Sequence, residues 1–306
     1  MKAIVSTTIN KPTEATLKFC WQSDWIMIMV GDKKTPHDDY FQLEKRFSNF
    51  KYLHPDEQEK KYKKISDIIG WNCIQRRPLG YIEAYNMGAE IIATVDDDNI
   101  PYDDWGKNLL VNKTVNVNLY ECDAEVFDPL SITNQSHLWH RGYPIDLLKT
   151  RHNVNKKGKV KRKVLIQADL WDGDPDIDAM ARLTYRPSVR FDVDSPYCSN
   201  KISPFNSQNT FISREVFPHY VVLPHVGRMD DIWGGYIAQY YYPDSVVYSK
   251  PTVCQVRNEH DIITDLEKEI IGYRYTLDLI NDLANYKNYL PDRTKVFVDE
   301  YRKAFK

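Results

Sequence analysis

The segment that most restricts the fold is an apolar, β-branched run at residues 91–95, which ends abruptly in three acids, Asp96, Asp97 and Asp98. Such a run is typical of a buried strand that stops at the edge of a sheet, where the ligand sites of α/β folds collect. Three crowded carboxylates repel one another unless a cation holds them, and oxygen ligands suit Mg²⁺ or Mn²⁺. The pattern therefore predicts a metal site that binds a diphosphate, with a helix cap or a solvated turn as the alternative.

Strand-like and helix-like segments alternate through the first part of the chain, which predicts an α/β fold with a mostly parallel, doubly wound sheet. The predicted strands cover residues 3–6, 25–30, 49–54 and 91–95, and the predicted helices cover residues 12–21, 38–47 and 80–89. Farther along we expect strands at 163–168 and 246–256, a helix that begins near Asp230, and helical spacing over 261–283.

No linker or internal repeat separates these parts, so we expect them to share one compact body. The expected organisation is one domain over residues 1–260, with a nucleotide-binding half (1–100) and an acceptor or sugar half (101–260). A C-terminal helical extension at 261–306 follows it.

Composition and charge exclude several classes of protein. The net charge is −2 and 42% of the residues are hydrophobic, so no global attraction to nucleic acid or to an anionic membrane is expected. No apolar run reaches the roughly 20 residues of a membrane span, and the N-terminus has no signal-peptide pattern, which favours a cytoplasmic location. The five cysteines lie too far apart for a zinc site or a small disulfide framework.

Polar side chains near the ends of the predicted strands are candidates for contacts to a nucleotide. Asp32 follows the second strand, where a carboxylate can accept hydrogen bonds from a base or a ribose, although a turn before Pro36 is an equal alternative. Arg77 precedes the helix that leads to the acidic run, and its guanidinium is suited either to a phosphate or to a surface ion pair. The candidate nucleotide contacts are Thr7, Thr8, Asn10, Asp32, Arg77 and Asp97.

A second group of acids lies at residues 170–178, around a Gly and a Pro that predict a loop. Hydrogen bonding to sugar hydroxyls is a natural use of such acids, and the EF-hand spacing of a calcium loop is absent. Residues 151–163 hold seven Lys or Arg and no acid, which predicts a solvated, mobile loop or one that closes over an anionic ligand. The candidate sugar or acceptor contacts are Trp171, Asp172, Asp174, Asp178, Asn209 and Trp233.

Asp230 and Asp231 lie at a predicted helix start. The helix dipole favours acids there, which explains one of them as a cap. A second acid beside Trp233 is not explained by capping, so the pair predicts a base or a ligand for a sugar hydroxyl, and Asp231 is preferred as the base. His260 is a candidate metal ligand through its imidazole, with ordinary polar surface as the alternative.

Five ordered motifs resemble the reversibly glycosylated polypeptide / UDP-arabinopyranose mutase family. The opening residues 6–10, together with residues 30–32 and 80–81, are still more similar to the related STELLO-type glycosyltransferases. The resemblance covers about residues 3–260 and implies a GT-A (Rossmann-like) nucleotide-sugar-binding fold with a mixed sheet. The motifs are Val95-Asp96-Asp97-Asp98, Arg141-Gly142-Tyr143-Pro144, Leu170 to Asp178, Asn206 to Phe211 and Arg228 to Gly235.

The resemblance also implies roles for single residues. Asp96 and Asp98 match the Asp-x-Asp that holds Mn²⁺ or Mg²⁺ on a nucleoside diphosphate, and Asp32 matches an acid at the nucleotide base. Arg141 matches the arginine that the mutase family glycosylates reversibly. Asp230 and Asp231 match that family's acid pair before a tryptophan. The family's Cys-Gly-Met-Asn is Asn206-Ser207-Gln208-Asn209 here, a departure on the sugar side of the site.

The sequence thus predicts a glycosyltransferase that depends on Mn²⁺ or Mg²⁺ and uses a nucleotide-sugar donor, with UDP as the expected nucleotide. Its acceptor is a glycan or a small molecule, and a homo-oligomer is left open. One alternative is a nucleotide-sugar mutase or self-glycosylating protein that acts through Arg141, and another is a non-catalytic nucleotide-sugar-binding protein.

Overall fold

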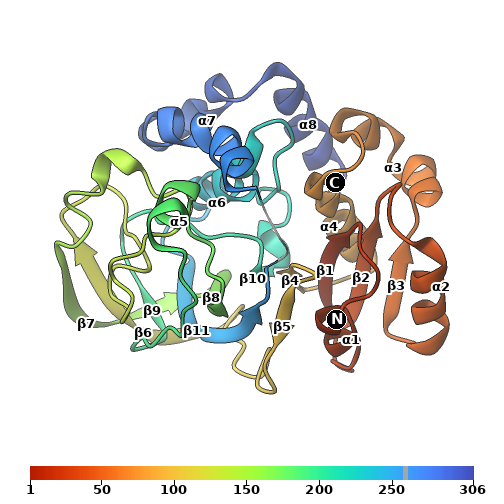
Figure 1. Cartoon of the computed structure of the whole chain (residues 1–306), viewed down its shortest axis with the longest axis horizontal. Helices are drawn as coiled ribbons and strands as arrows, with labels where there is room; N and C mark the ends of the chain where they lie inside the picture. Colours follow the sequence, from red (N-terminus) through yellow and green to blue (C-terminus); the bar gives the residue numbers. More distant parts are fainter. Residues whose placement is uncertain (258–260) are drawn as a thin grey trace.

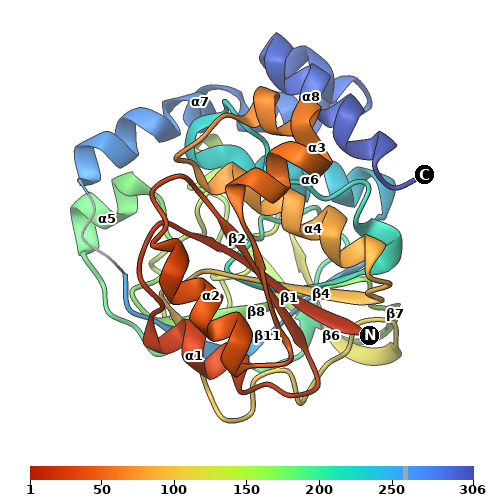
Figure 2. The ribbon, with the colours of Figure 1, turned by 90° about the vertical axis from the view of Figure 1, so that its right-hand side faces the viewer.

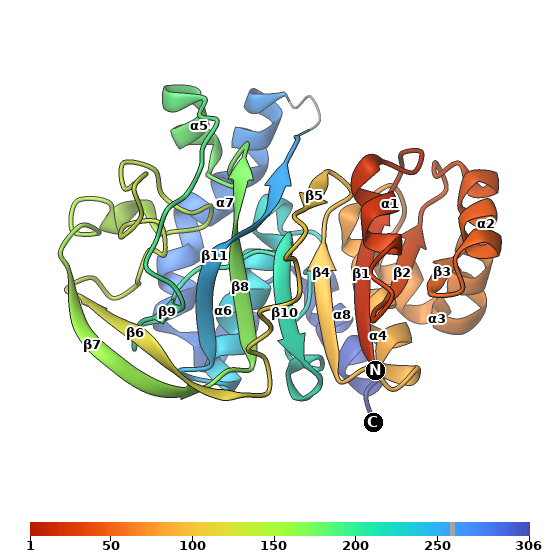
Figure 3. The same ribbon diagram turned by 90° about the horizontal axis from the view of Figure 1, so that it is seen from below.

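The computed structural model describes residues 1–257 and 261–306, and these residues build a single eleven-stranded sheet in the order β3-β2-β1-β4-β10-β8-β11-β9-β6-β7, with β5 paired to β11. The first four strands of this order are all parallel, as the sequence predicts. Figure 3 shows them following one another across one half of the sheet. They are β1 (Lys2–Thr8), β2 (Ile26–Gly31), β3 (Phe50–Leu53) and β4 (Ile91–Val95).

The other half of the sheet is mixed. β10 is antiparallel to both β4 and β8, and β8 is parallel to β11. The sheet therefore changes direction where β4 meets β10. The remaining strands are β5 (Asn99–Pro101), β6 (Thr114–Cys122), β7 (Val154–Lys163), β8 (Ile166–Gly173), β9 (Tyr197–Cys198), β10 (Asn209–Ser213) and β11 (Val246–Gln255).

Helices cover both faces of the sheet (Figure 2). Successive residues of a strand point to opposite faces, and both faces of β1 are apolar. Ala3 and Val5 join a core that contains Trp233, whereas Ile4 joins a second core that contains Phe19. Because both faces of its strands are apolar, the sheet needs a helix layer on each side. The α-helices are α1 (Glu14–Cys20), α2 (His37–Arg46), α3 (Pro55–Ile69), α4 (Arg77–Asn86), α5 (Ala179–Tyr185), α6 (Asp230–Tyr241), α7 (Ile262–Asn281) and α8 (Asp292–Lys303).

The two C-terminal helices pack on the body of the protein (Figure 1). α8 packs against α3, and α7 packs against the short 3₁₀ helix η4 (Gly227–Met229) and against α5. A Cβ on Gly272 of α7 would lie 2.5 Å from the sulfur of Met229, so the bare glycine allows this close approach. The helical spacing expected over 261–283 corresponds to α7, and the C-terminal helices lie on the same side of the sheet as α6 (Figure 3).

The structure corrects two predictions about loops. Most of the basic stretch at 151–163 is not a loop but the edge strand β7, which pairs antiparallel with β6. The strand expected at 163–168 begins at Ile166 and continues to Gly173, so the first acid of the 170–178 group, Asp172, lies in a strand. The α/β class and the mixed sheet are confirmed. Among the described helices, none has both the length and the apolar character needed to cross a bilayer.

Candidate functional site

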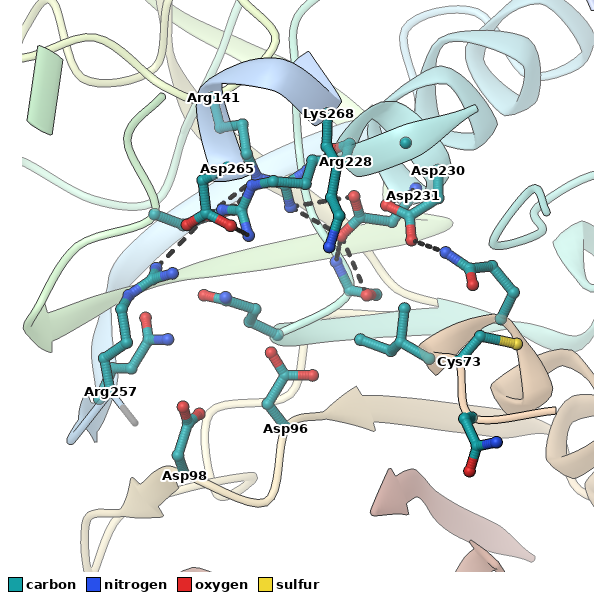
Figure 4. A pocket seen from close by; sticks show the side chains of 18 of the residues that line it. Cys73, Asp96, Asp98, Arg141, Arg228, Asp230, Asp231, Arg257, Asp265 and Lys268 are labelled. Carbon is teal, nitrogen blue, oxygen red and sulfur yellow. Dashed lines mark hydrogen bonds and ion pairs between the residues drawn. The ribbon is translucent and has the colours of Figure 1, made fainter. Parts of the chain in front are cut away.

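A cavity of about 490 Å³ lies beyond the carboxyl end of β4, between the sheet edge and helices α6 and α7 (Figure 4). The strand order places β4 next to β1, and the chain leaves β1 toward β2 on its other side. Such a reversal is where open α/β sheets bind ligands. Described residues that line the cavity include residues 72–75, Asp96, Asp98, Arg141, Asp176, Ser207, Gln208, His225, Gly227, Arg228, Asp230, Asp231, Gln255, Arg257, Asp265 and Lys268.

Asp96 and Asp98, the predicted metal ligands, both face this cavity (Figure 4). One oxygen of Asp96 accepts a hydrogen bond from Arg77, whose guanidinium also donates to the carbonyl of Ser207 at 2.9 Å. Arg77 is 1% exposed and lies behind Asp96. Arg77 therefore holds Asp96 in place, and the structure does not make it a lining residue of the cavity.

Asp98 has Gln255 and Arg257 as polar neighbours, but neither satisfies its Oδ1. Its Oδ1 is buried without a hydrogen bond, and burial together with Asp96 and Asp97 raises the pKa of Asp98 to about 7. Two amide oxygens of the cavity wall, Gln208 Oε1 and Gln255 Oε1, are also buried and unpartnered. A buried polar atom without a partner is costly. Three oxygen atoms therefore lie at this cavity without a hydrogen-bond partner among the residues that the structure describes.

Unpartnered carboxylate and amide oxygens are the donor types that Mg²⁺ and Mn²⁺ accept. Among the described residues, no group of three or more His, Cys, Asp and Glu is arranged to hold a metal. Ions of this kind commonly keep water or phosphate oxygens in their coordination shell, and one or two carboxylates then suffice. The donor set at Asp96 and Asp98 fits that second arrangement. The candidate ligand His260 lies outside the described residues.

Arg141 lines the cavity but is fully occupied. Its Nε donates to both oxygens of Asp176 at 2.9 and 3.0 Å, and its Nη2 donates to both oxygens of Asp231 at 3.0 and 3.2 Å. Its Nη1 donates to the carbonyl of Arg228. Burial opposes the charge, but Asp176 and Asp231 outweigh it and raise the pKa of Arg141 well above its usual value. The side chain is therefore a buried, charged bridge.

Asp230 and Asp231 both line the cavity at the start of α6, but their partners differ. Asp231 accepts from Arg141 and from the backbone N–H and hydroxyl of Ser207, at 2.8 and 3.0 Å. Asp230 accepts from Gln75 at 2.6 Å and from the N–H of Asp231 at 3.0 Å. Burial and the charge of Asp231 raise the pKa of Asp230 to about 7. Asp230 can therefore change its protonation state near neutral pH.

The predicted nucleotide contacts at the end of β1 bind one another. Thr8 and Asn10 donate to the same oxygen of Asp97, with Asn10 at 3.0 Å. Thr7 donates to the carbonyl of Val30 at 2.8 Å. Asn10 is exposed and Asp97 is half-buried, and neither is a lining residue of the cavity. The structure thus brings this group together at the edge of the sheet, outside the cavity.

Asp32 is buried at 1% exposure, and both of its oxygens accept backbone N–H groups. Lys33 donates at 2.6 Å and Cys73 at 3.1 Å. Cys73 itself lines the cavity. Asp32 is thus held in a turn, as one reading of the sequence expects, and it fixes the loop at 72–75 that forms one wall of the cavity.

None of the six predicted sugar contacts lines the cavity, and all of them except Trp171 have a hydrogen-bond or ion-pair partner elsewhere in the described residues. Trp171 and Trp233 are 2% and 0% exposed, and the indole N–H of Trp233 donates to Thr276 at 2.9 Å. Asn209 joins Trp105 to the backbone of Leu170. The acids behave similarly: Asp172 accepts from Tyr102 and Phe191, Asp174 pairs with Arg182, and Asp178 caps α5 through Ala181.

Sequence reasoning missed several residues of the cavity wall, namely Gln75, Gln255, Arg257 and Lys268. None follows a recognisable motif. Gln208 belongs to the polar run at 206–209, which the sequence marks as a departure from the mutase family. That run is the one local signal that pointed to an additional residue of the wall.

Two curated relatives, Probable glycosyltransferase STELLO2 and STELLO1 of Arabidopsis thaliana, are each 25% identical to this chain over 258 residues. The alignments cover 78% of this chain and 33% of each relative, so the chain spans about a third of the length of the curated relatives it matches. No family model matches the chain. The similarity to STELLO glycosyltransferases predicted above is confirmed, and the resemblance to the mutase family stays a prediction.

The solved structures that resemble this fold include glucosyl-3-phosphoglycerate synthase from Mycobacterium tuberculosis. Its complex with phosphoglyceric acid has a TM-score of 0.44, and its complex with Mn²⁺, uridine-diphosphate-glucose and glycerol 3-phosphate has a TM-score of 0.45. Both are 11% identical, with 95% of this chain and 81% of the other covered. Both likenesses are weak in sequence and in superposition.

Proposed function

We propose that this protein is a GT-A-type glycosyltransferase that uses a UDP-sugar donor and a divalent metal ion. The observation that carries the proposal is the buried, unpartnered oxygen of Asp98 beside Asp96, at the carboxyl end of β4 and inside a cavity. The similarity to the STELLO glycosyltransferases supports the reaction class. The acceptor is a glycan or a small molecule.

Asp96 and Asp98 would hold the metal, because Arg77 engages only one oxygen of Asp96 and Asp98 Oδ1 has no partner. The amide oxygens of Gln208 and Gln255 offer further donors in the same cavity. A bound Mn²⁺ or Mg²⁺ neutralises charge that develops on a diphosphate leaving group. The nucleoside would extend from the metal toward Asp97 and Asn10 at the ends of β4 and β1.

Asp230 is the better candidate for the base that accepts the proton of the acceptor hydroxyl. Its pKa near 7 matches the working range of a general base. Asp231 is committed to Arg141 and Ser207, so both of its oxygens already accept hydrogen bonds from the protein. We therefore propose Asp230 as the base in place of Asp231, which the sequence analysis preferred. Asp231 would orient Arg141 and the start of α6.

Self-glycosylation through Arg141 gains no support from the geometry. A guanidinium is a nucleophile only when it can lose a proton and turn toward the sugar. The Nε, Nη1 and Nη2 of Arg141 each donate to an acceptor in the protein. The transferase is therefore favoured over the alternative that acts through Arg141.

Titration calorimetry with UDP, with and without Mn²⁺, tests the proposal on the wild type, on Asp98→Asn and on the matched control Asp103→Asn, an exposed acid off the cavity. We expect Mn²⁺-dependent binding of UDP by the wild type and the control, and a loss of about tenfold or more in Asp98→Asn, or roughly 1.4 kcal/mol. Mass spectrometry of donor hydrolysis over a panel of nucleotide sugars then identifies the sugar. Equal UDP affinity in all three proteins would reject the metal site.

A further inference from the structure

A buried arginine at the cavity has two nitrogens for which the described residues supply no hydrogen-bond acceptor. Arg257 lies two residues beyond the end of β11, and its side chain is 7% exposed. Its Nε and Nη2 are buried without a hydrogen-bond partner. The nearest carboxylate oxygens belong to Asp174 and Asp176, at 3.4 Å from Nε and 3.7 Å from Nη2. These two nitrogens form the edge with which a guanidinium binds a phosphate or carboxylate bidentately.

The two nearby carboxylates are already committed to other donors. Asp176 accepts both Arg141 and the amide of Asn206, which donates at 2.8 Å. Asp174 pairs with Arg182. If Arg257 served only as the ion-pair partner of these two acids, its Nε and Nη2 would therefore still lack a hydrogen bond. Burial lowers the pKa of Arg257, Asp176 and Asp174 oppose this shift, and the positive charges of Arg182 and Arg228 add to it.

A second cation reaches the same cavity from α7. Lys268 is exposed at its side chain, and no ion pair involves it among the described residues. Figure 4 shows its amine pointing from α7 into the space above Asp96. The backbone at Lys268 lies against η4, because a Cβ on Gly227 would meet the Lys268 carbonyl oxygen at 2.1 Å. The helix thus fixes the point from which this flexible side chain reaches inward.

We propose that Arg257 and Lys268 form an anion clamp that binds a phosphate group in this cavity. The bidentate edge of Arg257 is the anchor, and Lys268 adds a mobile point charge. The source of the phosphate rests on the proposed function. It is either the diphosphate of the donor or a phosphate carried by the acceptor, and these two sources share the same chemistry at the clamp.

Calorimetry with inorganic sulfate tests the clamp, since sulfate is a tetrahedral dianion that leaves Mn²⁺ in solution. Sulfate is titrated into the free protein and into protein saturated with UDP and Mn²⁺. The variants are Arg257→Gln and Lys268→Gln, and the matched control is Arg274→Gln, an exposed arginine of α7 that does not line the cavity. Arg257→Lys keeps the charge but lacks the bidentate edge. Melting temperatures establish that each variant is folded.

We expect sulfate to bind the free wild type and to bind Arg257→Gln about tenfold or more weakly, the loss typical of a charge-assisted hydrogen bond. Arg257→Lys should be intermediate and the control unchanged. Sulfate that binds alongside UDP and Mn²⁺ assigns the clamp to the acceptor. Sulfate that competes with UDP, together with weaker UDP binding in the variants, assigns it to the donor.

Two outcomes separate failure of the clamp from failure of the proposed function. If neither sulfate nor UDP affinity differs between the wild type and the folded variants, the clamp is rejected even where UDP binds with Mn²⁺. If the wild type binds no UDP but binds sulfate through Arg257, the clamp stands and the nucleotide-sugar function is rejected.

Discussion

Replacing Arg141 by alanine should destabilise the fold severely, because this guanidinium is the shared partner of two buried acids. Asp176 and Asp231 are 0% and 3% exposed, and Arg141 donates two hydrogen bonds to each. Alanine removes the charge and all of these donors at once. Asp176 would keep Asn206 as a donor and Arg257 as a more distant cation at 3.7 Å, whereas Asp231 would keep the uncharged Ser207.

The expected magnitude follows from the cost of leaving a buried charge without its partner, about 3–5 kcal/mol for one broken buried ion pair. Two acids lose their partner here, although both border a cavity that water can enter, so we expect about 4 kcal/mol. Small domains have about 5–15 kcal/mol of total stability. Arg141→Ala should therefore remain folded at best marginally, whereas the exposed control Arg190→Ala should change stability by less than about 0.5 kcal/mol.

The loss should also depend on pH. Burial by itself would raise the pKa of Asp176, but Arg141 outweighs burial and holds the pKa well below its ordinary value of 3.8. The stability that comes from this depressed pKa is complete above the unfolded value and is lost as the pH falls through the folded one. The variant lacks that contribution. The difference between the two proteins should therefore be full at pH 7 and shrink below about pH 4.

Urea denaturation at pH 7 and at pH 3 measures both effects. Asp176→Asn in the Arg141→Ala background should recover part of the loss, since the orphaned charge is then gone. A loss under about 1 kcal/mol at pH 7 would contradict the role of Arg141 as a buried bridge. A loss of stability that is equal at the two pH values would also contradict this role.

Two further predictions concern the cavity wall. Asp230→Asn should lower donor turnover by about 10²-fold and remove the rise in rate through pH 7 that the wild type shows in saturating Mn²⁺. Asp231→Asn should act mainly on stability. Equal pH profiles for the wild type and Asp230→Asn would rule out Asp230 as the base. Gly227→Ala should lower stability by about 2 kcal/mol or more, because a Cβ would meet the Lys268 carbonyl oxygen at 2.1 Å and φ is +61°. Gly88→Ala, at φ +84° with open space around it, is the control, and similar melting temperatures for the two would contradict the contact.

The sequence predicted the acidic edge of the sheet because its signal is local. Residues 91–95 are all buried, and the chain becomes polar where the strand ends. The same holds for the start of α6, since acids near a helix N-terminus follow from the helix dipole. In both places neighbouring residues alone determine where the carboxylates lie.

The tryptophan side chains next to these acids do not line the cavity, and the reason is geometric. Trp233 follows Asp231 by two positions on α6, and residues two apart on a helix lie on nearly opposite sides. Trp233 therefore packs in the core beneath α7 while Asp231 faces the cavity. Residues 171 and 172 alternate across β8 in the same way, so sequence neighbours in these motifs do not share one surface.

The sequence analysis did not predict helix α3, because the buried face of this helix is partly polar. Gln58 and Ser66 are 0% and 1% exposed, and both accept hydrogen bonds from Arg76 at 2.7 and 2.9 Å. An amphipathic pattern counts only apolar residues and so misses a face that binds an arginine. Arg76 stacks on Trp71 at 3.5 Å and shapes the loop at 72–75. Polar burial of this kind depends on tertiary partners that the local sequence does not reveal.

The boundary expected at residue 260 divides the candidate site, because α7 belongs to the cavity wall. Glu269 of α7 is 0% exposed and accepts from Arg228 Nε and from the backbone N–H of Ala179, each at 2.7 Å. One carboxylate of α7 thus ties η4 to the start of α5. Since Arg228 in turn offers its carbonyl to Arg141, the C-terminal helix fixes the bridge that orders Asp231. The helical segment after residue 260 therefore supplies part of the wall of the candidate site, through Asp265 and Lys268.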